Sequence, residues 1–587
     1  MDDDLNDPGL RARAVRAARG LAPFDVLIRG AMLADVATGE LRAADIGLVG
    51  PLVASIHAQG ARGDAARIVE AGGLVAAPGL IDMHLHIESS MVTPRRYAET
   101  VVPQGTTTIC WDPHEVGNVM GLDGVRWAAA AARDLPLRIL LLAPSCVPSA
   151  PGLERAGAAF GGGEMATMLS WPEVAGVAEV MDMRGVLEGS ARMAAIVGAG
   201  LASGKLVCGH GRGLGEAELG AFAAAGIGSD HEITSGEDLL AKLRAGFTIE
   251  LRGSHDYVLP GVVAALATLP GLPPTLTLCT DDVFPDDLAA AGGMNDVLRR
   301  LVGYGMAPLD ALRAATLQAA LRLKRDDLGL VAPGRRADLV LFEDLAGFRA
   351  ALVFAGGREV AAGGRLTAEL RPDPVALPGG SVKVPMLSVA DFRIAANGAR
   401  VRLRTVDKPR FTEWGEVEAR VEGGAVVLPD GAVMMAVVHR HGRAAPSPVL
   451  GVLRGWGEWR GAIASTIAHD SHNLVVLGRD PADMAAAATA VIEAQGGVAV
   501  AQGGTVRALL PLPVCGLLSD APTAEVAAGF AALRRAAEGI ADWVAPLASI
   551  KSVFGASLAC NPGPHVTDIG IADGTTGQVF ASAVIAA

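Results

Sequence analysis

Short apolar segments alternate with helical patterns between residues 75 and 280. Most of these segments are apolar at nearly every position, which is typical of parallel strands buried on both faces. The expected strands are residues 75–82, 106–112, 138–143, 176–180, 205–209, 226–230, 247–251 and 275–280. The expected helices between them include residues 122–135, 186–202, 215–225 and 256–269. This alternation predicts an α/β fold, a (β/α)8 TIM-like barrel, with an open doubly wound sheet as the alternative.

Two blocks of short strands flank this region. Residues 25–57 and 337–357 carry strand patterns broken by turns, so we expect a small split β-sandwich built from both sides of the barrel. The Pro- and Gly-rich residues 372–380 predict a linker to an additional C-terminal α/β (α+β) domain. In that domain we expect strands at 400–404 and 433–439 and a helix at 482–495. The expected divisions are 1–76 for the N-terminal segment and first half of the sandwich, 77–330 for the barrel, 331–371 for the second half of the sandwich, and 385–587 for the C-terminal domain.

Composition and charge narrow the range of partners. With 587 residues, of which 51% are hydrophobic and 19% charged, the chain should form several well-packed domains. The net charge of −13 argues against a nucleic-acid surface, and no long uninterrupted apolar run indicates a membrane span. The six cysteines are scattered without a Cys-x-x-Cys pair, so we expect reduced thiols and a cytoplasmic location.

His84 and His86 follow the first apolar segment, two positions apart. On an extended strand they project from one face, so both imidazoles can reach one metal ion. In a barrel, functional groups sit where the strands end. The polar residues expected at strand ends are His84, His86, Asp112, His114, Glu115, Glu179, His210, Asp230, His231, Glu232, Asp281 and Asp282. One such residue alone is commonly a satisfied polar group, but imidazoles and carboxylates at the ends of most strands predict a metal centre.

Six of these residues form a pattern that resembles the amidohydrolase superfamily: His84, His86, Glu179, His210, His231 and Asp281. Within it, residues 81–91, 111–119, 228–232 and 467–473 resemble the bacterial adenine deaminase family, and the resemblance covers nearly the whole chain. It implies two divalent ions bridged by Glu179. His84, His86 and Asp281 would hold one ion, and His210 and His231 the other. Imidazole and carboxylate ligands suit Mn²⁺, Fe²⁺ or Zn²⁺, and the resemblance favours Mn²⁺ or Fe²⁺.

The resemblance also implies the activity, which is hydrolysis of adenine to hypoxanthine and ammonia. Two divalent ions lower the pKa of a shared water, so that hydroxide can attack C6 of adenine near neutral pH. We expect Asp281 to carry the proton towards the leaving ammonia, and Glu115 or His114 to protonate a ring nitrogen. The expected catalytic residues are Asp281, Glu115 and His231, and the expected substrate contacts are Glu88, His114 and His255. Glu115 could instead hydrogen-bond the barrel rim or bind an additional metal ion with His114, and His255 could be a capping residue.

A second histidine cluster lies in the C-terminal domain. His469, Asp470 and His472 have a spacing that could bind metal or reach over the barrel mouth. The favoured interpretation is a turn stabilised by Asp and Ser side chains. His439 and His441 lie in strand or turn contexts without converging partners, so we expect them to be structural.

Two rival functions differ in the residues they need. An N-acetylglucosamine-6-phosphate deacetylase also uses a bridging Glu, but it needs a phosphate-binding cluster, and only Arg212 and Arg252 stand at strand ends. A non-catalytic scaffold would have lost metal ligands, whereas this chain keeps all six. The expected partner is therefore a small-molecule substrate, adenine, with no nucleic acid and no membrane. The apolar flanks of the barrel also make a homo-oligomer, a dimer or tetramer, the expected assembly.

Overall fold

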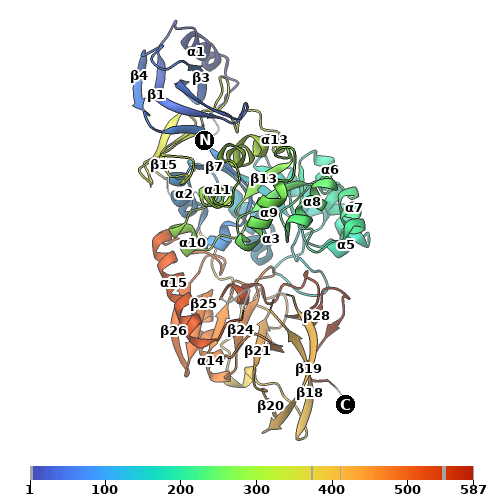
Figure 1. Ribbon diagram of the computed structural model, residues 1–587. Helices are drawn as coiled ribbons and strands as arrows, with labels where there is room; N and C mark the ends of the chain where they lie inside the picture. Colours follow the sequence, from blue (N-terminus) through green and yellow to red (C-terminus); the bar gives the residue numbers. More distant parts are fainter. Residues whose placement is uncertain (1–3, 372–374, 410, 545–549, 586–587) are drawn as a thin grey trace.

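The computed structural model describes residues 4–371, 375–409, 411–544 and 550–585. Three parts follow one another along its length (Figure 1): a β-rich part built from both sides of the barrel sequence, the barrel itself, and the C-terminal domain. Part of the expected linker, residues 372–374, lies outside the described residues, and its described remainder up to residue 387 forms neither helix nor strand.

Eight parallel strands form the central sheet, in the order in which they occur in the chain. They are β6 (Leu80–Leu85), β7 (Thr106–Trp111), β8 (Arg138–Pro144), β9 (Val174–Val180), β10 (Leu206–Gly209), β11 (Ser229–Asp230), β12 (Thr248–Arg252) and β13 (Leu276–Cys279). The last strand returns to the first, because Leu85 pairs with Asp281 in a parallel bridge and the Asp281 N–H donates to the His84 carbonyl (3.0 Å). The sheet is thus closed into a barrel, and the prediction of a (β/α)8 fold is confirmed.

The helices around the barrel begin and end at different residues from those expected. The major ones are α2 (Pro94–Val101), α3 (His114–Ala131), α4 (Gly162–Leu169), α6 (Ala191–Ser203), α7 (Glu216–Ala224), α8 (Gly236–Arg244), α9 (Leu259–Leu266) and α11 (Met294–Gly303). The expected helix 186–202 is interrupted, because Gly189 has a φ of +69° and Ser190 caps a new helix by accepting from the Met193 N–H. More importantly for the site, α3 starts eight residues earlier than expected, so His114 and Glu115 lie in its first turn.

The expected strand 75–82 is wrong, since it is two strands in two different sheets. β5 (Val75–Pro78) pairs with strands of the flanking sheet, whereas β6 starts the barrel. Gly79 lies at the change, where its N–H donates to the Asp338 carbonyl (3.0 Å) and a Cβ atom would meet the Thr107 side chain at 2.1 Å. Only a residue without a side chain allows the chain to pass this closely between the sheets.

The flanking sheet has nine strands and draws on both sides of the barrel sequence, as expected. Its N-terminal strands are β1 (Phe24–Asp35), β2 (Glu40–Val49), β3 (Leu52–His57), β4 (Ala65–Glu70) and β5, and its later strands are β14 (Leu339–Phe342), β15 (Ala350–Ala355), β16 (Arg358–Ala362) and β17 (Arg365–Leu366). The two halves join where β5 pairs antiparallel with β14. Apolar side chains from both halves, such as Ile28, Ile46, Leu339 and Phe354, share one buried cluster.

The C-terminal domain contains a second nine-stranded sheet and a small three-stranded one. The strands are β18 (Arg400–Asp407), β19 (Glu413–Glu422), β20 (Ala425–Val427), β21 (Ala432–Val438), β22 (Val449–Arg454), β23 (Ala462–Ser465), β24 (Leu474–Gly478), β25 (Gly497–Gln502), β26 (Thr505–Pro511), β27 (Pro564–Thr567), β28 (Gly570–Asp573) and β29 (Val579–Phe580). Its helices include α14 (Pro481–Glu493), which confirms the expected helix, α15 (Thr523–Ile540) and α16 (Lys551–Phe554). The six cysteines are free, and within the described residues no helix is both long and apolar enough to cross a membrane.

Polar contacts join the C-terminal domain to the barrel. Arg534 on α15 forms an ion pair with Asp286 at the start of α10 (Pro285–Ala290), at 2.7 Å, and the Thr93 hydroxyl donates to Asp520 at 2.9 Å. The Asn473 amide donates to the Arg155 carbonyl (2.9 Å). These contacts place the C-terminal domain against the barrel end at which the strands finish (Figure 1).

Candidate metal centre

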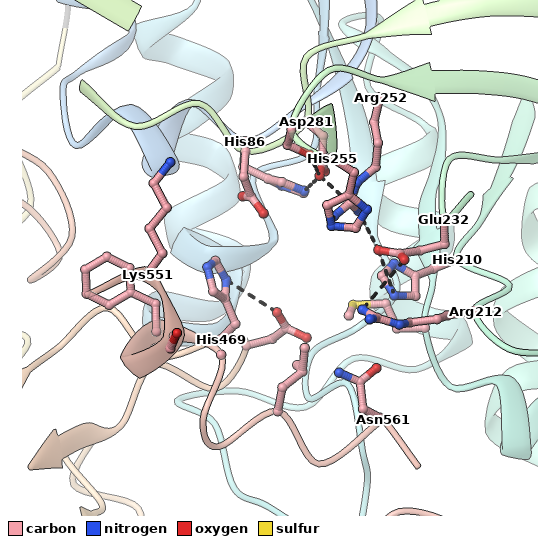
Figure 2. A pocket seen from close by; sticks show the side chains of 18 of the residues that line it. His86, His210, Arg212, Glu232, Arg252, His255, Asp281, His469, Lys551 and Asn561 are labelled. Atoms are coloured by element: carbon pink, nitrogen blue, oxygen red, sulfur yellow. Dashed lines mark hydrogen bonds and ion pairs between the residues drawn. The ribbon is translucent and has the colours of Figure 1, made fainter. Parts of the chain in front are cut away.

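A cavity of about 520 Å³ lies between the strand ends of the barrel and the C-terminal domain. Figure 2 shows His210, Arg212 and Glu232 on one wall, with His469 and Lys551 of the C-terminal domain across from them. The lining residues from the barrel include His86, His114, Glu179, His210, His231, Arg252, His255 and Asp281. The volume is in the range of small-molecule sites.

The first half of the predicted metal centre is built on β6. His84 and His86 point towards the same place, because His84 lies in β6 and His86, two positions on, follows the strand directly with an extended backbone. His86 Nε2 lies 3.4 Å from Glu179 Oε1 and 3.5 Å from Asp281 Oδ1, and His84 Nε2 lies 3.7 Å from Asp281 Oδ1. Two ligand atoms that share an ion at metal–ligand distances near 2 Å are roughly 3–4 Å apart. The separations therefore fit one divalent ion.

The second half lies on the other side of the same carboxylate. Glu179, at the end of β9, has its Oε2 atom 2.6 Å from His210 Nδ1 and 3.0 Å from His231 Nε2. Its Oε1 atom faces the β6 histidines. One carboxylate thus presents a separate oxygen to each half, which is the geometry of a residue that bridges two ions.

Charge and burial in this cluster suit metal binding. Burial opposes the charge on Glu179, yet His210 and His231 hold the pKa of its carboxyl well below its usual range. Burial likewise disfavours a charged His231, but the Glu179 and Asp281 carboxylates raise the pKa of that imidazole to about 9. Burial and the neighbouring His231 lower the pKa of His84 well below its ordinary value. Both ring nitrogens of His84 are buried without a hydrogen-bond partner among the described residues, and one of them, Nε2, lies 3.7 Å from Asp281 Oδ1. An unpaired imidazole nitrogen beside a carboxylate fits a metal ligand.

Asp281 is held in place by several groups. It has a left-handed backbone (φ +59°), which aspartate tolerates better than most residues, and its N–H is anchored on β6. Its Oδ2 atom accepts from the Ser254 hydroxyl (2.9 Å) and faces the Arg252 guanidinium (3.0 Å). Burial opposes its charge, but Arg252 and nearby histidines hold its pKa well below the usual range. Arg252 also bonds to Glu232 and His255, so one guanidinium orders this wall of the cavity.

The residues expected to contact substrate are split between two places. His114 and His255 line the cavity, whereas Glu88 and Glu115 do not. The Glu88 carboxylate accepts from Trp111 Nε1 (2.7 Å) and from the Val116 N–H (3.3 Å). Burial, with the Glu88 charge nearby, raises the pKa of Glu115 well above its ordinary value. Both carboxyl groups therefore lie behind the cavity wall.

Residues 469–472 form a turn, as expected, which the His472 N–H closes by donating to the Ala468 carbonyl (2.8 Å). This segment, between β23 and β24, is buried against the barrel, and His469 and Asp470 line the cavity. His472 Nε2 lies 3.5 Å from Glu115 Oε2, and the Asp470 carboxylate lies 3.5 Å from His114 Nε2. Local spacing alone did not show the partners of these side chains, because the partners are on a different domain. His441 is also tied to this loop, through a hydrogen bond of 2.8 Å between its Nε2 and the Ser471 carbonyl.

Some lining residues were missed in the sequence. Lys551, Asn561 and His565 reach the cavity from the last part of the chain, where no strand-end rule applies. Arg212 and Arg252 also line the cavity, and the expectation of functional groups at strand ends applies to both, because Arg212 follows β10 and Arg252 ends β12.

A closed (β/α)8 barrel with two imidazole clusters on one bridging carboxylate defines a metal-dependent hydrolase of the amidohydrolase class. The amidohydrolase family model matches residues 75–360, and the model of the adenine deaminase C-terminal domain matches residues 409–578. Adenine deaminase 2 of Agrobacterium fabrum is 61% identical over 582 residues, which cover 99% of this chain and 98% of that protein. The adenine deaminase of Klebsiella pneumoniae (strain 342) is 53% identical, covering 97% and 95%, and that of Moorella thermoacetica is 39% identical, covering 89% and 90%. The chain belongs to the adenine deaminase family.

Proposed function

We propose that the protein hydrolyses adenine to hypoxanthine and ammonia. The observation that carries the proposal is that the other five expected ligand residues gather around the Glu179 carboxylate, in a chain that is 61% identical to a protein named adenine deaminase over nearly its full length. Neither rival function is favoured, because this chain keeps the full ligand set and the adenine deaminase C-terminal domain.

The cofactor in this proposal is a pair of divalent ions, Mn²⁺ or Fe²⁺, with Zn²⁺ as a further candidate. His84, His86 and Asp281 would hold one ion, His210 and His231 the other, and Glu179 would bridge them. When bound, the pair supplies a water molecule of lowered pKa, so that hydroxide is available near neutral pH.

The chain's own residues supply proton transfer and orientation. Asp281 lies on the cavity wall with its charge stabilised by Arg252, so it can accept a proton from the nucleophile and pass it to the leaving amino group. Arg252 and Ser254 position that carboxylate, and His231 lies beside it, with its Nε2 3.0 Å from Glu179. His114 and His255 are the proposed substrate contacts, His114 through its ring, because its Nδ1 faces Asp112 and its Nε2 faces Asp470. Direct proton donation by Glu115, or contact with Glu88, is not part of the proposal, because both lie behind the wall.

Substrate choice in this proposal depends on polar contacts rather than on space. A cavity of about 520 Å³ is large enough that its volume alone does not exclude a ribose. Selectivity would come from buried polar groups that a wrong base leaves unpaired, a penalty that can exclude an analogue almost completely.

The test is ammonia release measured side by side on adenine, adenosine, AMP, cytosine and guanine, with the Mn²⁺-loaded protein and with chelator-treated protein as control. We expect turnover of adenine only, and its loss after metal removal. A kcat/KM for adenosine equal to that for adenine would refute the substrate assignment, and full activity without metal would refute the mechanism.

A further inference from the structure

A second group of metal-type side chains lies where the C-terminal domain meets the barrel. Two members, His114 and Glu115, come from the first turn of α3, and three, His469, Asp470 and His472, come from the loop between β23 and β24. Four of the five residues are at most 2% exposed, and His469 forms part of the cavity wall (Figure 2). The proposed reaction uses none of the three loop residues.

The separations in this group are those of metal ligands rather than hydrogen bonds. His469 Nδ1 lies 3.8 Å from Glu115 Oε1 and 3.7 Å from Asp470 Oδ1, and Asp470 Oδ1 lies 3.5 Å from His114 Nε2. Hydrogen bonds between nitrogen and oxygen are about 2.7–3.2 Å long, whereas ligand atoms around one ion are roughly 3–4 Å apart. One ligand atom each from His114, Glu115 and His469 lies within 4.8 Å of the other two.

Several of these atoms are buried without a hydrogen-bond partner in the described parts of the chain. They are His114 Nε2, Glu115 Oε1, Asp470 Oδ2 and His472 Nε2. Leaving carboxylate oxygens and imidazole nitrogens unpaired in the interior is costly. A cation between them would pair directly with His114 Nε2 and Glu115 Oε1.

Neighbouring groups orient the ligands in the way that metal sites require. The Asp112 carboxylate bonds to His114 Nδ1 (2.8 Å), which directs His114 Nε2 towards the group, as in carboxylate–histidine–metal arrangements. His472 Nδ1 accepts from the Ala468 N–H (3.2 Å), so a neutral His472 carries its proton on Nε2, which lies 3.5 Å from Glu115 Oε2. A protonated ring nitrogen cannot bind an ion, so His472 lies beside the site and is not a ligand.

The loop that carries His469 is fixed by main-chain contacts. The His469 N–H donates to the Phe554 carbonyl (2.8 Å), and the wholly buried Arg440 donates to the carbonyl of His472. Arg440 also bonds to the carbonyls of Ser381 and Cys515, so its guanidinium ties three segments of the domain together. These hydrogen bonds fix the position of the loop that carries His469.

We propose that His114, Glu115 and His469 bind a third divalent transition-metal ion. Two imidazoles and a carboxylate suit Zn²⁺, Mn²⁺ or Fe²⁺. The site is separate from the bridged centre, since His114 turns Nδ1 towards Asp112 and Glu179 and Nε2 towards the new site. Its ligands come from two domains, so the ion fastens the C-terminal domain to the barrel at the cavity wall.

The test counts the ions bound per chain. Full-length protein is stripped with a chelator, reloaded with Mn²⁺ or Zn²⁺, freed of excess metal, and analysed by inductively coupled plasma mass spectrometry. We expect about three ions in the parent, about two in His469→Asn, and about three in His565→Asn, a matched control that removes another imidazole of the same domain and cavity. Two ions in the parent, or three in His469→Asn, would overturn the proposal.

A crystal of the reloaded parent gives an answer that does not depend on how the variants fold. Anomalous scattering at the absorption edge of the metal should show a peak between Glu115 and His469, separate from those at Glu179, and absence of that peak refutes the site. The outcome is independent of the proposed reaction, because Glu179→Gln should lose the ions of the bridged centre and keep the third.

Discussion

Replacement of Asp281 by asparagine should remove the proton carrier of the proposed reaction while leaving the shape of the cavity nearly unchanged. The amide keeps one oxygen that can accept from the Ser254 hydroxyl (2.9 Å). The Arg252 guanidinium, 3.0 Å from Asp281, keeps its ion pair with Glu232, so the substitution does not leave a buried cation unpaired. The cost to folding should therefore be small compared with the effect on the reaction.

The size of that effect follows from the role of the residue. General acid–base groups contribute about 10²–10⁴-fold to turnover, which is about 2.7–5.5 kcal/mol of activation free energy at about 1.36 kcal/mol per tenfold. Asp281 is only 3% exposed, so bulk water cannot easily replace it as a proton carrier. We therefore expect the loss in kcat to lie towards the upper half of that range, with KM changed by less than about threefold.

The assay is steady-state ammonia release from adenine, with the metal content of each preparation measured in parallel. Asp256→Asn is the matched control, because Asp256 also lines the cavity but is 55% exposed and pairs with Arg300, an exposed ion pair of the kind that contributes about 0–1 kcal/mol. It should stay within about threefold of the parent. Turnover of Asp281→Asn within a few-fold of the parent, at full metal content, would refute the role of Asp281, and a parallel loss of metal would assign the defect to metal binding.

Two further predictions concern metal binding and pH. Glu179→Gln should lower the occupancy of both ions of the bridged centre, since each oxygen of Glu179 faces a different pair of histidines; retained metal content and activity would contradict the bridge. Burial raises the pKa of Glu154 from 4.5 to about 7, so the folded protein binds a proton on this carboxyl more tightly than the unfolded chain does. The free energy of unfolding therefore falls by about 3 kcal/mol as the pH rises from 4.5 to about 7. Glu154→Gln should therefore raise the Tm relative to the parent more at pH 8 than at pH 5, and an equal difference at the two pH values would rule this out.

Local sequence was sufficient to bring together the barrel residues of the proposed metal centre, and their assignment to two bridged ions came from the family resemblance. Two histidines at positions i and i+2 of a strand must share a face, whatever the rest of the chain does. Parallel strands of one barrel also end on the same side, so the positions of Glu179, His210 and Asp281 at strand ends predict that they lie close together. The strands are strongly apolar, so their number and order could be predicted. The prediction of a single strand at 75–82 missed that the chain passes from one sheet to another at Gly79.

The second histidine group could be placed only by the tertiary structure. The His469 loop looks like a polar turn in sequence, because nothing nearby in the chain shows that it is buried against α3. In the same way, Glu115 was expected to face the substrate, but the first turn of α3 and the hydrogen bonds around Glu88 turn it behind the cavity wall. Secondary-structure periodicity records which face of an element is buried, and it contains no information about which distant domain covers that face. Strand pattern and spacing therefore determined which barrel residues gather at the proposed metal centre, whereas the closure of the cavity and the residues that line its far wall were decided by the docking of the C-terminal domain.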